Sequence, residues 1–137
     1  PVVVIADSVL MFLPEDEVAA LFRRIVERFP SGEIVFTAYS SMVKEREAKR
    51  GAGPFFERYG VSATQWTLDE PSDVEKFDAR LTFVERLSQV DPRLHRRAPL
   101  LDRLMCMLIC TTRSGKYAGS VLRYRFSSAV PTRPQAG

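Results

Sequence analysis

The sequence has little cysteine and little histidine. Only two cysteines and one histidine occur in 137 residues. Cys106 and Cys110 are four residues apart in an apolar run that predicts a helix, and two residues within one helical turn are poorly placed for a disulfide. We expect two small buried hydrophobic side chains in a reducing cytosol. No further ligands have suitable spacing, so we expect no metal site.

Long apolar runs are also lacking. A membrane-spanning helix needs about twenty predominantly apolar residues, and every longer run here contains charged or polar groups. The opening run VVVIA has no basic leader before it, so it does not match a secretory signal. We therefore expect a cytoplasmic protein without a membrane partner.

The basic residues form no long block, although the net charge is +3. Seventeen acidic residues are interleaved with twenty basic ones. The densest cluster, Arg93, Arg96 and Arg97 around His95, is typical of a solvated helix face, with phosphate binding as the alternative. We expect no nucleic-acid partner, because a nucleic-acid footprint would be more concentrated.

The hydrophobic pattern predicts alternating strands and helices, the order of an α/β fold. The expected elements are strand 2–7, helix 14–29, strand 33–39, helix 41–50, a helical turn at 54–60, an extended segment at 66–69, a brief helix at 71–77, strand 80–90, helix 99–112, turn residues 114–116 and strand 117–128. Strand 2–7 is β-branched without polar alternation, which predicts burial on both faces. Helix 99–112 is apolar enough to be buried. We expect one α/β domain over 1–127 and a loose tail from 128.

Several residues carry a resemblance to a known family. In the segment 2–40 an acid, Asp7, ends the strand, Phe12-Leu13-Pro14 opens the helix, and Phe29, Pro30 and Gly32 lead into the next strand. This segment resembles the fourth strand, following helix and fifth strand of methyltransferases related to leucine carboxyl methyltransferase. The bacterial branch of polyketide-biosynthesis O-methyltransferases is the closer match, and QWTLDEPSDVEKF, RLTFVERLSQVDP and VLRYRF also resemble it.

The resemblance implies an α/β class I fold that uses S-adenosylmethionine. The family sheet has seven strands in the order 3-2-1-4-5-7-6, with the seventh antiparallel, and this chain would supply the 4-5-7-6 half. The glycine-rich turn and the ribose-binding acid of the other half cannot be found. Gly51-Ala52-Gly53 follows a charged helix rather than a strand, so we interpret it as a loop. We expect the chain alone to be truncated and inactive.

The resemblance also implies where the cofactor would lie. Asp7, Ser8, Val9 and Phe12 would lie under its methionine part, at the carboxyl end of the first strand. Asp7 would accept hydrogen bonds from the ammonium group or from an ordered water. The alternative for Asp7 is a cap of the following turn.

The substrate residues that the resemblance implies lie after the second predicted strand. They are Tyr39, Met42, Phe55, Phe56 and Trp66. Taken singly, each aromatic residue favours core packing over a pocket. Together they would suit an apolar aromatic acceptor, and the resemblance implies a small molecule, polyketide-like or carboxylate. Methyl transfer is an in-line displacement in which positioning supplies much of the rate. No catalytic base is assigned, because the only histidine, His95, lies far along the chain from the strand ends.

In this half-sheet the first strand would be unpaired along one edge, because the strands of the other half are missing. An unpaired apolar strand is prone to association unless it is covered. The cover would be the missing N-terminal half or, in a homodimer, a second copy. A non-catalytic interaction module that dimerises through this strand is therefore the alternative function.

Overall fold

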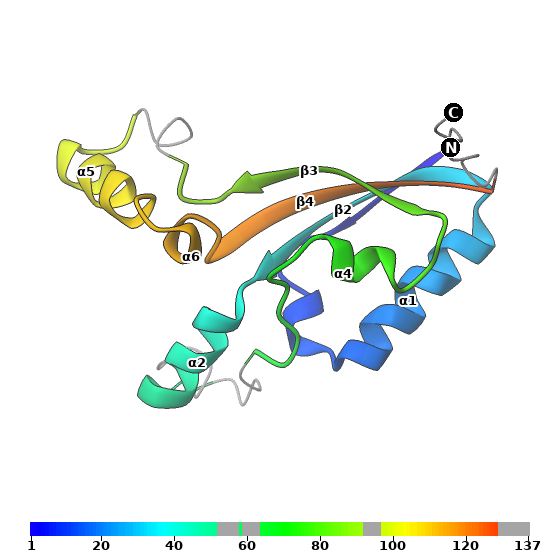
Figure 1. The fold of residues 1–137 in the computed structure, drawn as a ribbon, viewed down its shortest axis with the longest axis horizontal. Coiled ribbons are helices and arrows are strands. Elements are labelled where there is room, and N and C mark those ends of the chain that lie inside the picture. Colours follow the sequence, from blue (N-terminus) through cyan, green and yellow to red (C-terminus); the bar gives the residue numbers. More distant parts are fainter. Residues whose placement is uncertain (52–57, 59–63, 92–96, 129–137) are drawn as a thin grey trace, which may run out of the picture.

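The computed structural model describes residues 1–51, 58, 64–91 and 97–128 as a mixed α/β unit with one four-stranded sheet (Figure 1). The predicted tail, the turn at 54–60 and the basic cluster around His95 lie wholly or largely outside these residues. The elements in chain order are strand β1 (Val2–Ala6), 3-10 helix η1 (Leu10–Phe12), helix α1 (Glu15–Arg28), strand β2 (Ser31–Tyr39), helix α2 (Ser41–Arg50), helix α4 (Ser72–Glu75), strand β3 (Leu81–Ser88), helix α5 (Leu100–Ile109), helix α6 (Arg113–Lys116) and strand β4 (Gly119–Ser127).

The strands lie in the order β1-β2-β4-β3, so the last strand in sequence is inside the sheet. Strands β1 and β2 are parallel, with Ile5 opposite Val35, and α1 connects them. Strand β4 is antiparallel to both of its neighbours. A bulge between Phe83 and Glu85 shifts the register of β3 against β4.

Helix α1 begins and ends where the sequence predicts. Pro14 is its N-cap residue, with φ of −61°, and the first turn carries Glu15, Asp16 and Glu17. The φ of Pro14 is already close to the helical value, and acidic side chains in the first turn interact favourably with the helix dipole. The helix ends before Phe29, whose backbone is extended. Pro30 follows and disfavours a helical conformation in the residue before it.

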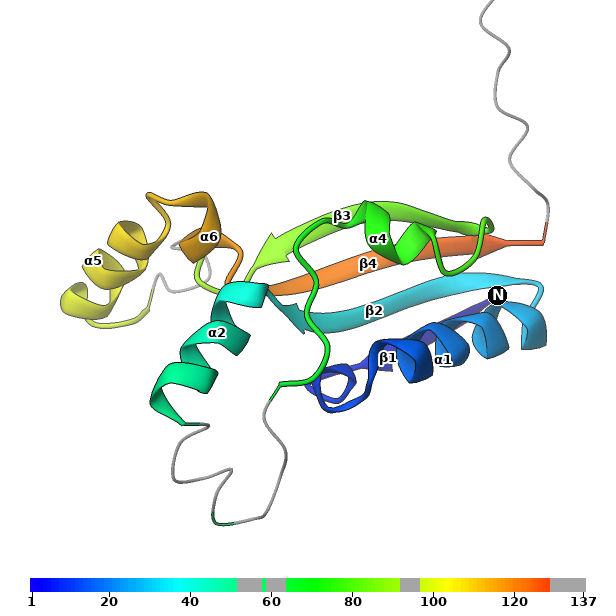
Figure 2. The same ribbon diagram turned by 60° about the horizontal axis from the view of Figure 1, so that its bottom comes forward.

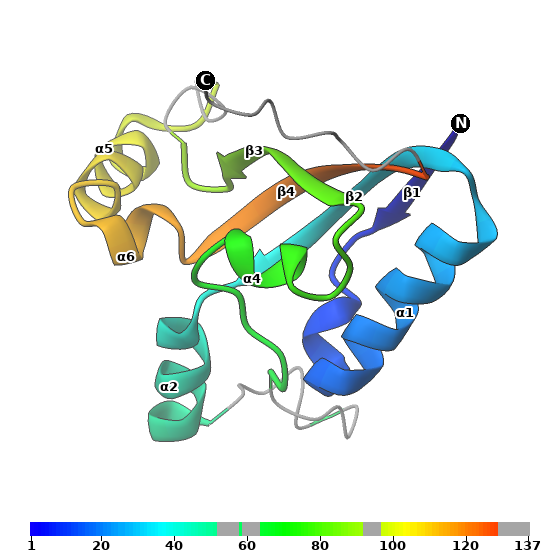
Figure 3. The ribbon, with the colours of Figure 1, turned by 45° about the vertical axis from the view of Figure 1, so that its right-hand side comes forward.

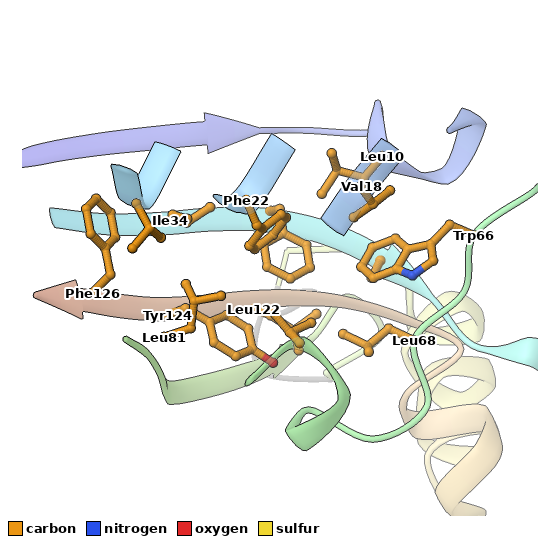
Figure 4. Packing of buried hydrophobic residues seen from close by; sticks show 14 residues of the cluster. Leu10, Val18, Phe22, Ile34, Trp66, Leu68, Leu81, Leu122, Tyr124 and Phe126 are labelled. Carbon is orange, nitrogen blue, oxygen red and sulfur yellow. The ribbon is translucent and has the colours of Figure 1, made fainter. Parts of the chain in front are cut away.

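One face of the sheet is covered by α1 and α4 (Figures 1 and 3). Their side chains pack with those of β2, β3 and β4 in one apolar core (Figure 4). The buried cluster comprises Leu10, Val18, Phe22, Val26, Ile34, Phe36, Ala38, Trp66, Leu68, Val74, Leu81, Leu122, Tyr124 and Phe126. Burial of this surface supplies most of the driving force for folding.

Aromatic rings form the centre of this core. Phe36 stacks on Tyr124 with ring centroids 5.6 Å apart, and Phe22 meets Phe36 edge-on at 5.3 Å. The hydroxyl of Tyr124 donates to the carbonyl of Pro71 at 2.7 Å, which ties the start of α4 to the sheet. Burial raises the pKa of Tyr124 far above its ordinary value, so this hydroxyl stays a donor.

The opposite face of the sheet, which we call the open face, has no helix of the described residues packed on it (Figure 2). Val3 is 62% exposed and Ile5 is 73% exposed. The prediction that the first strand is buried on both faces is therefore wrong for this chain. Strand β1 is an edge strand among the described residues, and its sequence could not reveal what covers its second face.

Two other predictions differ from the structure. Helix α5 forms, but it is exposed rather than buried, because the apolar run favours a helix without supplying a partner for it. Residues predicted as the turn at 114–116 belong to the short helix α6. The predicted extended segment at 66–69 lies outside the helices and the strands of the sheet and packs against the core.

Candidate functional site

The carboxyl ends of β1 and β2 meet at one edge of the sheet because the two strands are parallel. Asp7 and Ser8 follow β1 directly, and Thr37 lies near the end of β2. The backbone N–H of Ser8 donates to Thr37 Oγ1 at 2.5 Å, and the Thr37 hydroxyl donates to Asp7 Oδ1 at 3.2 Å. The Ser8 hydroxyl donates to the same Asp7 oxygen at 3.1 Å. This network fixes the chain as it leaves the strand.

Ser8 has a positive φ of 54°, which is uncommon for a residue other than glycine. Strained backbone of this kind persists where the surrounding structure fixes it, often at functional sites. The turn leaves the Asp7 side chain exposed at the sheet edge. Among the described residues, Asp7 Oδ2 has no hydrogen-bond partner, and η1 has no side-chain cap.

The other two residues implied for the cofactor lie beside this turn. Val9 is 47% exposed and precedes η1, while Phe12 is half-buried. The Gln65 side chain donates to the carbonyl of Phe12 at 2.9 Å and so holds the end of η1. Asp7, Ser8, Val9 and Phe12 are thus gathered at one edge, with three of them exposed.

A shallow apolar groove of about 290 Å³ lies below Asp7 on the open face. Its lining residues come from β1, β2 and β4 and from the positions just after β1 and β3, namely Ile5, Asp7, Val35, Phe36, Thr37, Gln89 and Val121. The groove places a carboxylate beside apolar surface. Ligands of open α/β sheets bind outside the carboxyl ends of the strands, which is where this groove ends.

A second cavity of about 350 Å³, the α2 pocket, lies where β2 passes into α2. It is lined by Ser40, Ser41, Met42, Asp69, Glu70, Arg86 and Tyr117. The carboxylate of Asp69 accepts the backbone N–H of Ser41 at 3.0 Å. An acceptor at this position satisfies one of the free N–H groups of the first helical turn.

Arg86 forms one wall of the α2 pocket. Its Nε donates to Ser120 Oγ at 2.9 Å, Nη1 to the carbonyl of Asp69 at 2.8 Å and Nη2 to the carbonyl of Tyr117 at 3.3 Å. The guanidinium also lies 4.3 Å from the centroid of the Tyr117 ring. Burial lowers the pKa of Arg86 from its ordinary value, and a guanidinium remains charged at neutral pH.

Ser40 links β2 to α2 and lines the α2 pocket. The residue is 6% exposed, and its hydroxyl oxygen has no hydrogen-bond partner among the described residues. The sequence predicts Ser40 as the cap of α2, and it does occupy the N-cap position, but its side chain makes no capping hydrogen bond. Asp69 supplies that acceptor instead.

The residues implied for substrate binding are only partly brought together. Tyr39 ends β2, and Met42 lines the α2 pocket in the first turn of α2. Trp66 is 4% exposed and packs in the core, 6.0 Å from Phe36 between ring centroids. Phe55 and Phe56 lie outside the described residues.

Asp69, Glu70, Arg86 and Tyr117 are lining residues of the α2 pocket that the sequence did not predict. Strand alternation places Arg86 on the same side as the outward residues Thr82 and Val84, but the bulge after Phe83 shifts it to the covered face opposite Leu122. A bulge re-aims the side chains that follow it. Its position depends on pairing with β4, so the sequence of β3 alone gives no signal for it.

Two kinds of function find no support in the described ranges. Residues 1–51, 58, 64–91 and 97–128 contain no group of histidine, cysteine, aspartate or glutamate side chains that could hold a metal ion. No helix in the same ranges combines the length and the apolar character that a membrane span needs. Cys106 and Cys110 are both free, and they are half-buried rather than buried as predicted, because the helix that carries them is exposed.

No family model matches the chain, and no curated protein matches it. Among solved structures, the chain is similar to a DUF574 family protein from Streptomyces avermitilis MA-4680, solved at 1.80 Å resolution, with a TM-score of 0.53 and 19% sequence identity. The match covers 92% of this chain and 44% of the other, so this chain spans less than half the length of that protein. A likeness at this identity shows a shared fold.

Proposed function

We propose that the chain forms the C-terminal half of a class I S-adenosylmethionine-dependent methyltransferase domain. The observation that carries this proposal is the strand order β1-β2-β4-β3, with β4 antiparallel between β2 and β3. These strands then correspond to the fourth, fifth, seventh and sixth strands of the family sheet. The likeness to the DUF574 structure agrees with a methyltransferase-like fold.

The groove below Asp7 is the proposed cofactor half-site. The exposed carboxylate there is oriented by Ser8 and Thr37, so it is ready to accept hydrogen bonds from an ammonium group. S-adenosylmethionine, when bound, supplies an electrophilic methyl group on sulfur. Tyr39 and Met42 lie at the same sheet edge, where they would position the oxygen of a small acceptor, polyketide-like or carboxylate, for in-line transfer.

We propose that this chain alone lacks activity because its open face is uncovered. Helices cover both faces of a doubly wound sheet, and here Val3, Ile5 and the neighbouring apolar residues have no cover among the described residues. The proposed missing N-terminal half would cover them and supply the glycine-rich turn. A half-site without that turn binds the cofactor weakly, because most of its hydrogen bonds are absent.

Two related nucleosides test the cofactor half-site. S-adenosylhomocysteine and methylthioadenosine share the adenosine and sulfur, but only the first carries the amino-acid group. Titrated into the ¹⁵N-labelled chain, S-adenosylhomocysteine should shift the amide signals of Ser8, Val9 and Phe12, with affinity near the millimolar range. Methylthioadenosine should shift them less, and Asp7→Asn should remove the difference.

The result would contradict the proposal if both nucleosides left these amides unmoved at saturating concentration. Calorimetry with S-adenosylmethionine should give no measurable heat at micromolar protein concentration. Tight one-to-one binding would show that the chain, alone or as a dimer, already has a complete cofactor site.

The second candidate function is a non-catalytic module that forms a homodimer through β1. The exposed Val3 and Ile5 on an edge strand favour it, since such edges pair with other chains unless they are covered. Sedimentation equilibrium should then show a dimer that Ile5→Lys dissociates. The matched control, Thr82→Lys, changes an exposed position on β3 at the other edge and should leave the dimer intact. A monomer at micromolar concentration would eliminate this candidate.

A further inference from the structure

We infer that the α2 pocket binds an uncharged, hydroxylated aromatic ring rather than a carboxylate. The inference starts from the size and position of the cavity. Its volume of about 350 Å³ is near the lower end of the range for small-molecule sites. It opens at the end of β2, where ligands of open α/β sheets bind.

The charges that line the pocket disfavour an anion. Asp69 and Glu70 contribute two carboxylates against the single guanidinium of Arg86. Arg86 donates through Nε, Nη1 and Nη2 to Ser120, Asp69 and Tyr117, so three of its five N–H groups are already used within the protein. The Lys116 ammonium lies 5.2 Å from the centroid of the Tyr117 ring but does not line the cavity.

The pocket also has surfaces that suit a ring. Arg86 stacks on Tyr117 and presents a flat wall, and the thioether chain of Met42 lies among the lining residues. Aromatic faces and polarizable sulfur make favourable contacts with ring edges and faces. A single ring with small substituents fits these walls without requiring a charge.

The unpartnered hydroxyl of Ser40 indicates that the ligand ring carries a hydroxyl substituent. A buried polar group without a hydrogen bond costs roughly 1–3 kcal/mol, and a hydroxyl both donates and accepts. A ligand hydroxyl that reaches Ser40 after a small side-chain rotation would recover this cost. Asp69, whose Oδ1 accepts from Ser41, offers a second acceptor for a hydroxyl proton.

The description of this ligand as the methyl acceptor rests on the proposed function, whereas its binding does not. The test therefore uses no cofactor. Resorcinol and 3-hydroxybenzoate differ only in replacing one hydroxyl by a carboxylate, and each is titrated into the ¹⁵N-labelled chain. Resorcinol should shift the amides of Ser41, Met42, Asp69 and Tyr117 and bind roughly three- to tenfold tighter at low salt. The preference should shrink as salt is added.

Two variants and a control test whether Asp69 and Ser40 cause the preference for resorcinol. Asp69→Asn keeps the acceptor for Ser41 but removes the charge, so the ratio of the two affinities should fall toward one. Ser40→Ala should weaken resorcinol binding about threefold without lowering the melting temperature, because the hydroxyl it removes has no partner in the free protein. Thr64→Val removes another buried, unpartnered hydroxyl outside the pocket and should leave binding unchanged.

Equal or tighter binding of 3-hydroxybenzoate would overturn the inference. So would resorcinol shifts that do not cluster at the pocket, or a Ser40→Ala variant with unchanged affinity. Resorcinol binding without any response to S-adenosylhomocysteine would support the pocket and contradict the proposed function. A response to S-adenosylhomocysteine without resorcinol binding would contradict the inference about the α2 pocket and would leave the proposed function standing.

Discussion

The two faces of the sheet differ in how far this chain completes them. The covered face carries the rings of Phe36, Tyr124 and Phe126, each no more than 1% exposed beneath α1 and α4. The open face carries Val3 and Ile5, which are more than half exposed. Both faces are apolar near β1, but only one has a partner within the described residues.

The open face is not uniform, because ion pairs cross its strands away from the groove. Arg123 lies between Glu33, with Nε and Oε2 3.1 Å apart, and Glu85, with Nη1 and Oε1 2.8 Å apart. Arg125 pairs with Glu33 at 3.3 Å. Charged cross-strand pairs suit a surface in contact with water, whereas the apolar groove beside Ile5 does not need them. The open face therefore has two regions: a solvated region with the ion pairs of Arg123 and Arg125, and an apolar region beside Ile5 that suits a partner.

The largest effect is expected from a matched pair of isoleucines on the two faces. Ile34→Ala on the covered face should lower the free energy of unfolding by about 2–5 kcal/mol, since the side chain is 1% exposed and leaves a cavity. Ile5→Ala, at a position 73% exposed, should cost less than about 1 kcal/mol. Urea denaturation of both variants measures the contrast. Similar losses would show that the open face is covered in solution.

The next largest loss of stability is expected at Gly32, where β2 contacts β1. A Cβ at Gly32 would lie 2.3 Å from the carbonyl oxygen of Val2, and that backbone oxygen must shift to accommodate it. Gly32→Ala should therefore cost roughly 1–3 kcal/mol and loosen the β1 amides in hydrogen exchange. The neighbouring change Ser31→Ala serves as the control. An unchanged unfolding midpoint for Gly32→Ala would show that β1 moves freely at this edge.

A smaller, pH-dependent effect is expected at the turn before β3, next to the covered face. The Arg80 side chain and N–H donate to Asp78 and hold the pKa of that carboxyl below its ordinary value of 3.8. A depressed pKa contributes stability above the ordinary value, and this contribution is lost as the pH falls through the folded-state value. Asp78→Asn should cost about 1 kcal/mol at pH 7, and the difference from the wild type should shrink below about pH 4. A difference that is constant with pH would contradict this.

The smallest effect is expected on the solvated part of the open face. Glu33→Gln removes the carboxylate shared by Arg123 and Arg125, both partly exposed. Exposed ion pairs contribute about 0–1 kcal/mol, so the unfolding midpoint should fall slightly and the loss should disappear in high salt. A large loss that persists in salt would indicate that a second copy buries this region.

Much of the fold could be predicted because local signals agree with it. Three acids after Pro14 and a proline after Phe29 bound α1, and β-branched runs mark β1 and β2. The candidate site could be predicted only in part. Asp7 and Ser8 follow a strand in the sequence and so must lie at its end, but Arg86 reaches the α2 pocket only because a bulge changes its side of the sheet.

The sequence by itself determined the four strands and the longer helices, the apolar character of β1 and α5, and the absence of a glycine-rich turn after a strand. These follow from periodicity and side-chain type, which act over a few residues. Only the tertiary structure decided that Trp66 lies in the core, that Ile5 and α5 are exposed, and that Asp69, Arg86 and Tyr117 share one pocket. Burial and proximity depend on segments far apart in the chain, and no local pattern records which of them will meet.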